Sequence, residues 1–375
     1  MSSIRHLSLA RWCAALPLAA AGLAQAQTVT AVQVCECLVT DISTDGKAAT
    51  GLMNGSYETF RWTLDGGLTL LGRATLPVIG TTSGMPSISG DGKKVAATVL
   101  DDTGTKATAG LWGPSNGWRM LAKPLPADGG QMDTEDSSVW GMSRDGKVVV
   151  GLYWRGGQTG GGSAHGYAWQ TETGMVGYAT AGGSARIDDA SKDGSVQAGW
   201  EEDSTWGGRR AAVWVNGVRT FLDKPQYFGE AEALTGDGLI AVGQSMDAES
   251  GMGMAAKWKF KDGGWKRKLL GVLPGTDFGG WAYANAVSED GKIVVGLGAK
   301  VFGPVTNGFV WTEAAGMEAA VDFFKAKGYY APRYDIKNVI AVTPNGQTFA
   351  VVELMKRSPY TQRTVLVTLP ATPAP

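Results

Sequence analysis

The feature that most constrains this chain is a four-residue signature that returns seven times: Ser or Thr, any residue, Asp or Asn, then Gly. Its third residue recurs at steps of 46, 54, 48, 44, 53 and 55 residues. A period of roughly 40–50 residues is typical of propellers and related repeat arrays. We interpret each signature as a hairpin turn, because Gly tolerates positive φ and the Ser or Thr hydroxyl can hydrogen-bond to the turn backbone. The structural turn residues are Asp45, Asp91, Asp145, Asp193, Asp237, Asp290 and Asn345.

Each repeat can be divided into four short strands around this turn. Six residues after the turn residue there is a Gly in five repeats, whereas Ala97 and Val351 stand there in the second and seventh. The third strand has a Trp in six repeats, and the seventh has Val367 at the matching place. A large aromatic side chain that recurs once per repeat is most simply a packing residue between adjacent blades. The six are Trp62, Trp112, Trp169, Trp214, Trp258 and Trp311.

These observations predict an all-β fold, a seven-bladed β-propeller of four-stranded antiparallel blades. The seventh repeat ends after its third strand, whereas an alternating segment at 28–34 precedes the first repeat. That spare strand can complete the last blade and close the ring, which removes exposed sheet edges. We expect the propeller over 27–369, a disordered tail over 370–375, and repeats near 36–73, 84–122, 137–178, 187–222, 231–271, 281–319 and 335–369.

The first 26 residues have the pattern of an export signal: basic residues at Arg5 and Arg11, an apolar core, and a small-x-small site at 24–26. We therefore expect residues 1–26 to be a signal peptide and the protein to be exported, either extracellular or periplasmic. No later segment offers about 18 consecutive apolar residues, so no membrane span is expected.

Charge and motifs argue against several classes of function. Lys and Arg total 34 against 35 Asp and Glu, and we found no concentrated basic block, so a nucleic acid partner is not expected. His165 is the only His after residue 26, which excludes His-rich metal sites, and we expect no metal and no cofactor. The chain lacks a nucleophile elbow, a phosphate loop and a dinucleotide fingerprint. We expect a monomer.

Beyond these patterns, the chain resembles a known family. Ser-x-Asp-Gly, an apolar strand ending in Gly, and then Ala-His-Gly-Tyr-Ala-Trp at 164–169 are similar to the bacterial HAF repeat of probable extracellular proteins. The resemblance covers essentially the whole chain after residue 26 and implies a secreted propeller with no established common activity. It also implies a short helix over 318–328, before the last repeat. The Ser-x-Asp-Gly-Lys turns resemble the propeller of the Tol translocation system as well.

Cys35 and Cys37 are the only thiols after residue 26. In an oxidising exterior they could form a local disulfide. Because alternate residues of a strand share one face, such a disulfide would require distortion of a strand. The alternatives are pairing with another chain, two inert thiols, or a redox-active or metal-carrying dithiol. Copper(I) is the metal suggested by the soft ligands Met246, Met252 and Met254.

Acidic and aromatic residues in the loops supply the candidate ligand-binding residues. In a propeller, the loops from second to third strand and the connections between blades gather on one face around the central channel. Tryptophans outside the repeat position, beside acids, suit binding of a glycan or a protein on this channel face. The alternative is a secreted polysaccharide hydrolase or lyase that uses a carboxylate pair there. The candidates are Trp154, Arg155, Asp188, Asp189, Trp200, Glu201, Glu202, Asp203, Trp206, Arg209, Arg210 and Glu232, with further acids at Asp133, Glu135, Asp136, Glu230 and Asp277.

Overall fold

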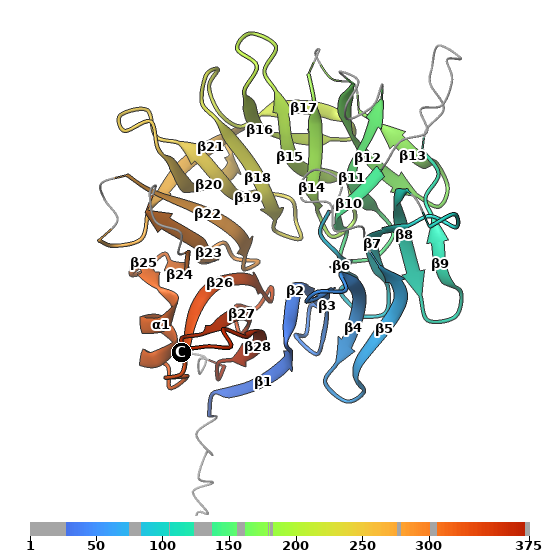
Figure 1. Ribbon diagram of the computed structural model, residues 1–375. Coiled ribbons are helices and arrows are strands. Elements are labelled where there is room, and N and C mark those ends of the chain that lie inside the picture. The colour runs from blue at the N-terminus through green and yellow to red at the C-terminus, as the bar shows by residue number, and fades with distance from the viewer. Residues whose placement is uncertain are drawn as a thin grey trace, which may run out of the picture.

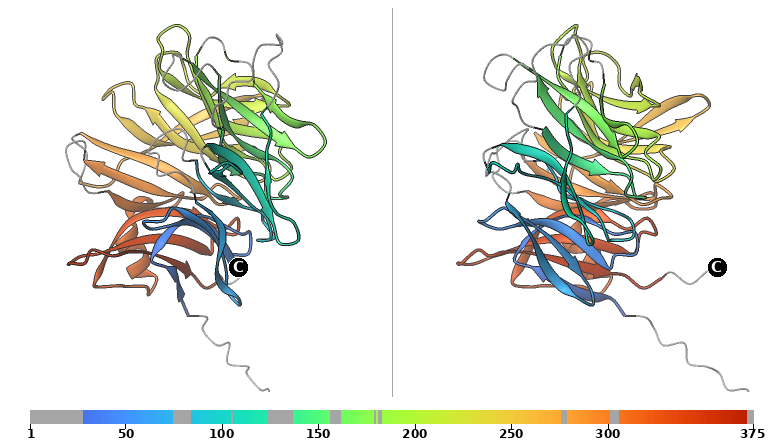
Figure 2. Two further views of the ribbon diagram at one scale, coloured as in Figure 1. Left: turned by 45° about the vertical axis from the view of Figure 1, so that its right-hand side comes forward. Right: turned by 90° about the vertical axis from the view of Figure 1, so that its right-hand side faces the viewer.

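The computed structural model describes residues 28–74, 84–104, 106–123, 137–155, 162–178, 180, 183–275, 279–300 and 306–371. These residues form seven antiparallel sheets of four strands each, and the sheets follow one another around a ring (Figure 1). The turned views show the blades side by side around the same ring (Figure 2). The predicted seven-bladed β-propeller is confirmed. The expected signal peptide over residues 1–26 lies outside the described residues.

Each blade contributes one innermost strand to the ring: β2, β6, β10, β14, β18, β22 and β26. The strands of blades one to three are β2 (Cys37–Ile42), β3 (Ala48–Met53), β4 (Glu58–Thr63), β5 (Gly67–Ala74), β6 (Ser87–Ile88), β7 (Val95–Leu100), β8 (Ala107–Gly113), β9 (Gly117–Met120), β10 (Ser137–Met142), β11 (Val149–Arg155), β12 (Ser163–Gln170) and β13 (Gly174–Gly177). Blades four to six comprise β14 (Ala185–Ala190), β15 (Val196–Glu202), β16 (Arg209–Val215), β17 (Val218–Phe221), β18 (Gly229–Leu234), β19 (Ile240–Met246), β20 (Gly253–Lys261), β21 (Gly264–Gly271), β22 (Gly280–Val287), β23 (Ile293–Lys300), β24 (Asn307–Thr312) and β25 (Gly316–Ala319).

The seventh blade is built from both ends of the propeller. Its strands β26 (Tyr334–Val342), β27 (Thr348–Met355) and β28 (Gln362–Thr368) come from the end of the chain. Its outermost strand is β1 (Thr30–Cys35), which pairs antiparallel with β28. Val32 lies opposite Leu366 in this pairing. The ring is therefore closed by the N-terminal strand, as predicted, and the sheet edge of β28 is covered.

The signature turns all lie on one face of the ring, which we call the turn face. In the first, Ser43 Oγ donates to Asp45 Oδ1 over 2.7 Å and accepts the backbone N–H of Ala48 over 2.9 Å. Gly46 follows at φ +69°, a conformation that suits Gly. The hydroxyl-to-side-chain bond recurs in all seven turns. The opposite face carries the loops between second and third strands and is called the loop face.

The repeated tryptophans pack between blades, as expected. Trp214 of blade four is 1% exposed and belongs to a cluster with Val148 and Val150 of blade three. Trp258 of blade five packs in the same way with Val213 of blade four. In blade seven, Val367 takes this place against blade six. One large side chain per blade therefore fills the wedge between neighbouring sheets.

The repeated Gly is explained by a β-bulge in the innermost strand. In blade four Ile187 pairs with Gly199 and Asp189 pairs with Ala198, so Asp188 is an extra residue. A Cβ at Gly199 would lie 2.0 Å from the carbonyl oxygen of Arg186. The other four repeated glycines meet an innermost-strand carbonyl oxygen at 1.9–2.0 Å. In blade two, which has Ala97 at this place, β6 pairs only with Val95 and Ala96. Blade seven has the bulge at Ile340 opposite Val351, and a second bulge lies just before it in β26.

One helix, α1 (Ala320–Ala326), lies within the described residues and precedes the last blade. It falls inside the segment for which the resemblance implied a short helix. Phe323 and Phe324 are buried against Phe349 of β27. Among the described residues no helix is long and apolar enough to cross a membrane.

Candidate functional site

The bulges place a ring of side chains along the central channel. The extra residue stands five positions before the turn residue in six blades, and it re-aims its side chain from the sheet toward the centre. These residues are Thr40, Trp140, Asp188, Glu232, Asn285 and Ile340. All six line a channel cavity of about 120 Å³. The fold thus converts one repeated backbone irregularity into a row of functional positions.

Blades three to six join their channel side chains into one ionic cluster. Arg186 lies seven residues before its turn residue and donates through Nε to Asp188 Oδ1. Its Nη2 donates to Glu230 Oε2 of the next blade over 3.2 Å and lies 3.8 Å from Glu232 Oε2. The guanidinium also stacks 3.7 Å from the ring centre of Trp140 of the preceding blade. One buried arginine therefore links three blades.

Tyr283 extends the cluster to blade six. Its hydroxyl lies 2.9 Å from Glu230 Oε2 and 2.8 Å from Glu232 Oε2. A tyrosine has one proton to donate, so the two carboxyl groups compete for it. Burial raises the pKa of Glu232, although the charge of Arg186 and the hydrogen bond from Tyr283 counteract the shift.

Asp188 is the least satisfied member of the cluster. Its side chain is 1% exposed, and its Oδ2 has no hydrogen-bond partner within the described part of the chain. Burial raises the pKa of its carboxyl well above the ordinary value despite the adjacent Arg186. The neighbouring carboxyl groups of Glu232 and Glu230 raise the pKa of Asp188 further. Asp188 Oδ2 is thus an unused acceptor in the channel wall.

A second charged cluster, formed by Asp189, Arg144 and Asp41, lies nearer the turn face. Asp189 accepts the backbone N–H of Leu234 over 2.8 Å, which ties blade four to blade five. Burial raises its pKa to about 7, although Arg144 counteracts the shift. Arg144 itself donates to Asp41 Oδ1 over 3.1 Å and to the carbonyl of Ile42 over 2.9 Å. These contacts brace the ring across the channel from blade three to blade one.

The structure divides the candidates of blades four and five. Asp188, Asp189 and Glu232 lie in the channel, and Arg209 joins their cluster by an ion pair with Glu230. Trp200 is buried beside the guanidinium groups of Arg186 and Arg209.

The other candidates serve local structure or stand apart from the channel cluster. Glu201 is buried and pairs with Arg219, and Arg210 pairs with Asp203 over 2.8 Å. Glu202 accepts the N–H of Ser184 over 2.7 Å. Trp206 is 38% exposed. Trp154 and Arg155 are half-buried at the end of β11. Asp133, Glu135, Asp136 and Asp277 lie outside the described residues.

A larger cavity opens on the loop face between blades five and six. It encloses about 390 Å³, within the usual range of small-ligand sites. Three half-buried aromatic side chains and two flexible ones line it, together with backbone at Gly251 and Gly253. The side chains are Phe228, Gln244, Met246, Trp281 and Tyr283. Because Tyr283 also hydrogen-bonds to Glu230 and Glu232, this aromatic cavity adjoins the ionic cluster.

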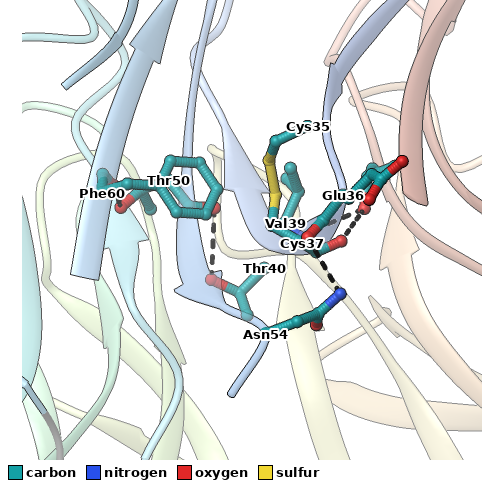
Figure 3. Close-up of a disulfide and its surroundings, with 9 residues drawn as sticks. Cys35, Glu36, Cys37, Val39, Thr40, Thr50, Asn54 and Phe60 are labelled. Carbon is teal, nitrogen blue, oxygen red and sulfur yellow. Dashed lines mark hydrogen bonds between the residues drawn. A yellow bond between two sulfur atoms is a disulfide. The ribbon is translucent and has the colours of Figure 1, made fainter. Parts of the chain in front are cut away.

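Cys35 and Cys37 form a disulfide where the chain passes from blade seven to blade one (Figure 3). Cys35 ends β1 and Cys37 begins β2. The pair therefore sits at a break between two strands, which supplies the distortion that a continuous strand would resist. Asn54 Nδ2 donates to the intervening carbonyl of Glu36 over 2.9 Å. Among the described residues no group of three or more His, Cys, Asp or Glu side chains could hold a metal ion.

Our sequence analysis missed Trp140, Arg186 and Tyr283, which complete the channel cluster. A usable signal was present, because residues at one offset before each turn residue occupy equivalent channel positions. Arg186, Glu230 and Tyr283 all stand seven residues before their turn residues. Aligning the repeats on the turn would have placed them side by side. The ion pair of Arg186 with Glu230 and the hydrogen bond of Tyr283 to Glu230 form only because their blades are neighbours in the ring.

No known protein family profile matches this chain, and a search of curated proteins found no match. Solved propellers are similar in fold. Oligogalacturonate lyase from Vibrio parahaemolyticus has a TM-score of 0.57 at 12% identity, covering 92% of this chain and 98% of that one. The β-propeller domain of Cps50 (Swd1) from Myceliophteria thermophila has a TM-score of 0.52 at 10% identity, covering 92% and 100%. TolB from Acinetobacter baumannii reaches 0.45 at 13% identity, covering 86% and 63%, too low to support an argument.

The seven four-stranded sheets, with the two likenesses above a TM-score of 0.5, establish the class of the protein as a seven-bladed β-propeller. At 10–12% identity these two likenesses show the fold alone. The HAF repeat stays a resemblance in the turn and third-strand motifs. Function has to be argued from the site, because propellers host many unrelated activities.

Proposed function

We propose that this chain is a non-catalytic binding propeller that holds a glycan on its loop face, in the aromatic cavity between blades five and six. The observation that carries the proposal is the joining of three aromatic rings with a polar network. Trp281, Phe228 and Tyr283 offer apolar ring surface, and Gln244 offers an amide. Sugars present C–H faces to aromatic rings and hydroxyl groups to such polar side chains.

The alternative ligand on this face is a protein segment. A cavity of about 390 Å³ would accept one or two side chains of a partner rather than a broad interface. We favour a glycan because its rings match a cavity of this size and need no large flat surface around it.

A polysaccharide hydrolase or lyase is the second candidate function. The buried carboxyl groups of Asp188 and Glu232, both with raised pKa, are the observation in its favour. Two features weigh against it. The channel cavity of about 120 Å³ is small for a sugar ring in a reactive position. Asp188 Oδ1 and Glu232 Oε2 are also engaged by Arg186 and Tyr283.

Thermal-shift screening of residues 27–375 against neutral and anionic oligosaccharides tests the binding proposal. A ligand that binds only the folded state raises the melting temperature by mass action. We expect a shift that is lost in Trp281→Ala and kept in Trp206→Ala, whose Trp is exposed outside the cavity. Loss in Trp206→Ala alone would move the site to the blade-four loop. Turnover of a bound oligosaccharide that is abolished by Glu232→Gln would favour the enzyme instead.

A further inference from the structure

The third and fourth strands of blade five form a hairpin that is longer than its counterparts. Strands β20 and β21 have 9 and 8 residues, whereas β4 and β5 of blade one have 6 and 8, and the fourth strands β9, β13, β17 and β25 have 4 each. The β20–β21 hairpin extends outward from the ring (Figure 1). Its segment from Lys257 to Lys268 contains five lysines, one arginine and a single acid, Asp262. This local basic block corrects our sequence-based statement that the chain has none, which rested on the near-zero net charge.

The strand register places all five lysines on one side of the hairpin. Lys257 is directly opposite Lys268, and Lys259 is directly opposite Lys266. Lys261 follows two residues after Lys259 and so shares its face. The intervening residues point to the other face, where Phe260 and Trp265 meet edge to face. We call the side with Lys257, Lys259, Lys261, Lys266 and Lys268 the lysine face.

The charges of the lysine face are not neutralised by ion pairs. Within the described chain, none of its five ammonium groups lies within 4.0 Å of a carboxylate, whereas Arg267 on the other face pairs with Asp223. Lys257 is buried, donates to the carbonyl of Gly291 over 2.9 Å and lies over Trp311. The other four lysines are exposed.

The lysines repel one another in this arrangement. Like charges directly opposite on neighbouring strands are destabilising. Burial lowers the pKa of Lys257, and the ammonium groups of Lys268 and Lys259 lower it further, with Glu313 acting in opposition. An anionic partner would relieve this repulsion.

We propose that the lysine face binds an anionic polysaccharide that carries carboxylate or sulfate groups. Alternate residues of a strand are spaced by about 7 Å and neighbouring strands by about 5 Å, so the exposed ammonium groups form a ladder of point charges. A linear polymer with regularly spaced anions complements such a ladder. The surface is independent of the proposed glycan site, because Lys257 meets the turn of blade six on the turn face and not on the loop face.

The chemistry of the lysine face favours a polysaccharide over nucleic acid. Proteins that bind single-stranded nucleic acid combine a basic groove with aromatic side chains on which bases stack. Here Phe260 and Trp265 lie on the opposite side of the hairpin from the lysines.

The experiment compares residues 27–375 with two triple variants in titrations against heparin, polygalacturonate and a single-stranded oligonucleotide. The test variant is Lys259→Ala, Lys261→Ala and Lys266→Ala. The control variant is Lys93→Ala, Lys147→Ala and Lys292→Ala, which removes the same charge from exposed lysines that lie 3.4–3.7 Å from the Asp of their own turns. Melting temperatures check that both variants fold.

We expect the wild-type protein to bind at least one of the polysaccharides and the test variant to bind it at least tenfold more weakly. The control should stay within about twofold. The magnitude of the slope of log affinity against log salt concentration should fall by roughly one for each of the three lysines replaced in the test variant. Three results would each overturn the proposal: equal losses of affinity in the two variants, absence of polysaccharide binding, or tighter binding of the oligonucleotide than of a polysaccharide of equal charge.

Discussion

Replacement of Gly199 by Ala tests the link between the repeated Gly, the bulge and the channel. The new Cβ would lie 2.0 Å from the Arg186 carbonyl oxygen and 2.9 Å from its carbonyl carbon. Carbon-to-oxygen contacts normally run at roughly 3.3–3.6 Å, so the strands would have to separate by more than 1 Å. The obstruction is backbone and cannot rotate away. Overpacking of this kind costs about 1–3 kcal/mol, and each backbone hydrogen bond weakened beside it adds about 0.5–1.5 kcal/mol.

We therefore expect Gly199→Ala to lower the free energy of unfolding by about 3 kcal/mol, a fall in melting temperature of roughly 5 °C or more. Calorimetry and urea titration measure both. Gly113→Ala is the matched control, because Gly113 ends a strand and a Cβ there would meet nothing within 4 Å. If Gly199→Ala were as stable as Gly113→Ala, the bulge of blade four would not require Gly and our account of Gly199 would be wrong.

Three further predictions follow from the same structure. Burial raises the pKa of Asp189 to about 7, so the folded protein retains a proton that the unfolded chain releases above about pH 4. This group therefore costs stability as pH rises from about 4 to 7, and urea titrations should show a smaller loss over that interval in Asp189→Asn; equal losses would contradict the assigned shift. Trp214→Ala should lower the free energy of unfolding by about 3–5 kcal/mol, measured by circular dichroism, because a fully buried blade contact is lost. Deletion of residues 28–34 should lower the melting temperature and produce concentration-dependent association in sedimentation, since β28 would become an open edge; an unchanged monomer would show that closure by β1 is dispensable.

The sequence alone determined the architecture because the relevant information is local and repeated. A hairpin turn needs a Gly at positive φ and a hydroxyl two residues before the turn acid, so seven copies at a steady period define seven blades. The spare strand at the start and the missing strand at the end defined the closure. The Trp in the third strand likewise indicated inter-blade packing from its recurrence.

The candidate site was only partly accessible in this way. Asp188, Asp189 and Glu232 were chosen as acids near the channel, yet the sequence analysis did not show that Asp188 is aimed inward by a bulge. Arg186 is one of three charged residues in the six-residue strand β14, and its role arises because blades three, four and five bring Trp140, Asp188 and Glu230 to it. Trp200 seemed a ligand-stacking residue but is buried beside two arginines.

The basic hairpin shows the same division between sequence and tertiary structure. Its lysines are plain in the sequence, but only the register puts Lys257 opposite Lys268 and Lys259 opposite Lys266 on one face. Net charge sums over the whole chain, whereas the field at a surface depends on which charges lie within about 10 Å of one another. The sequence therefore determined the ring and its turns. The tertiary structure alone decided which side chains meet, because contacts between blades join residues about 50 positions apart.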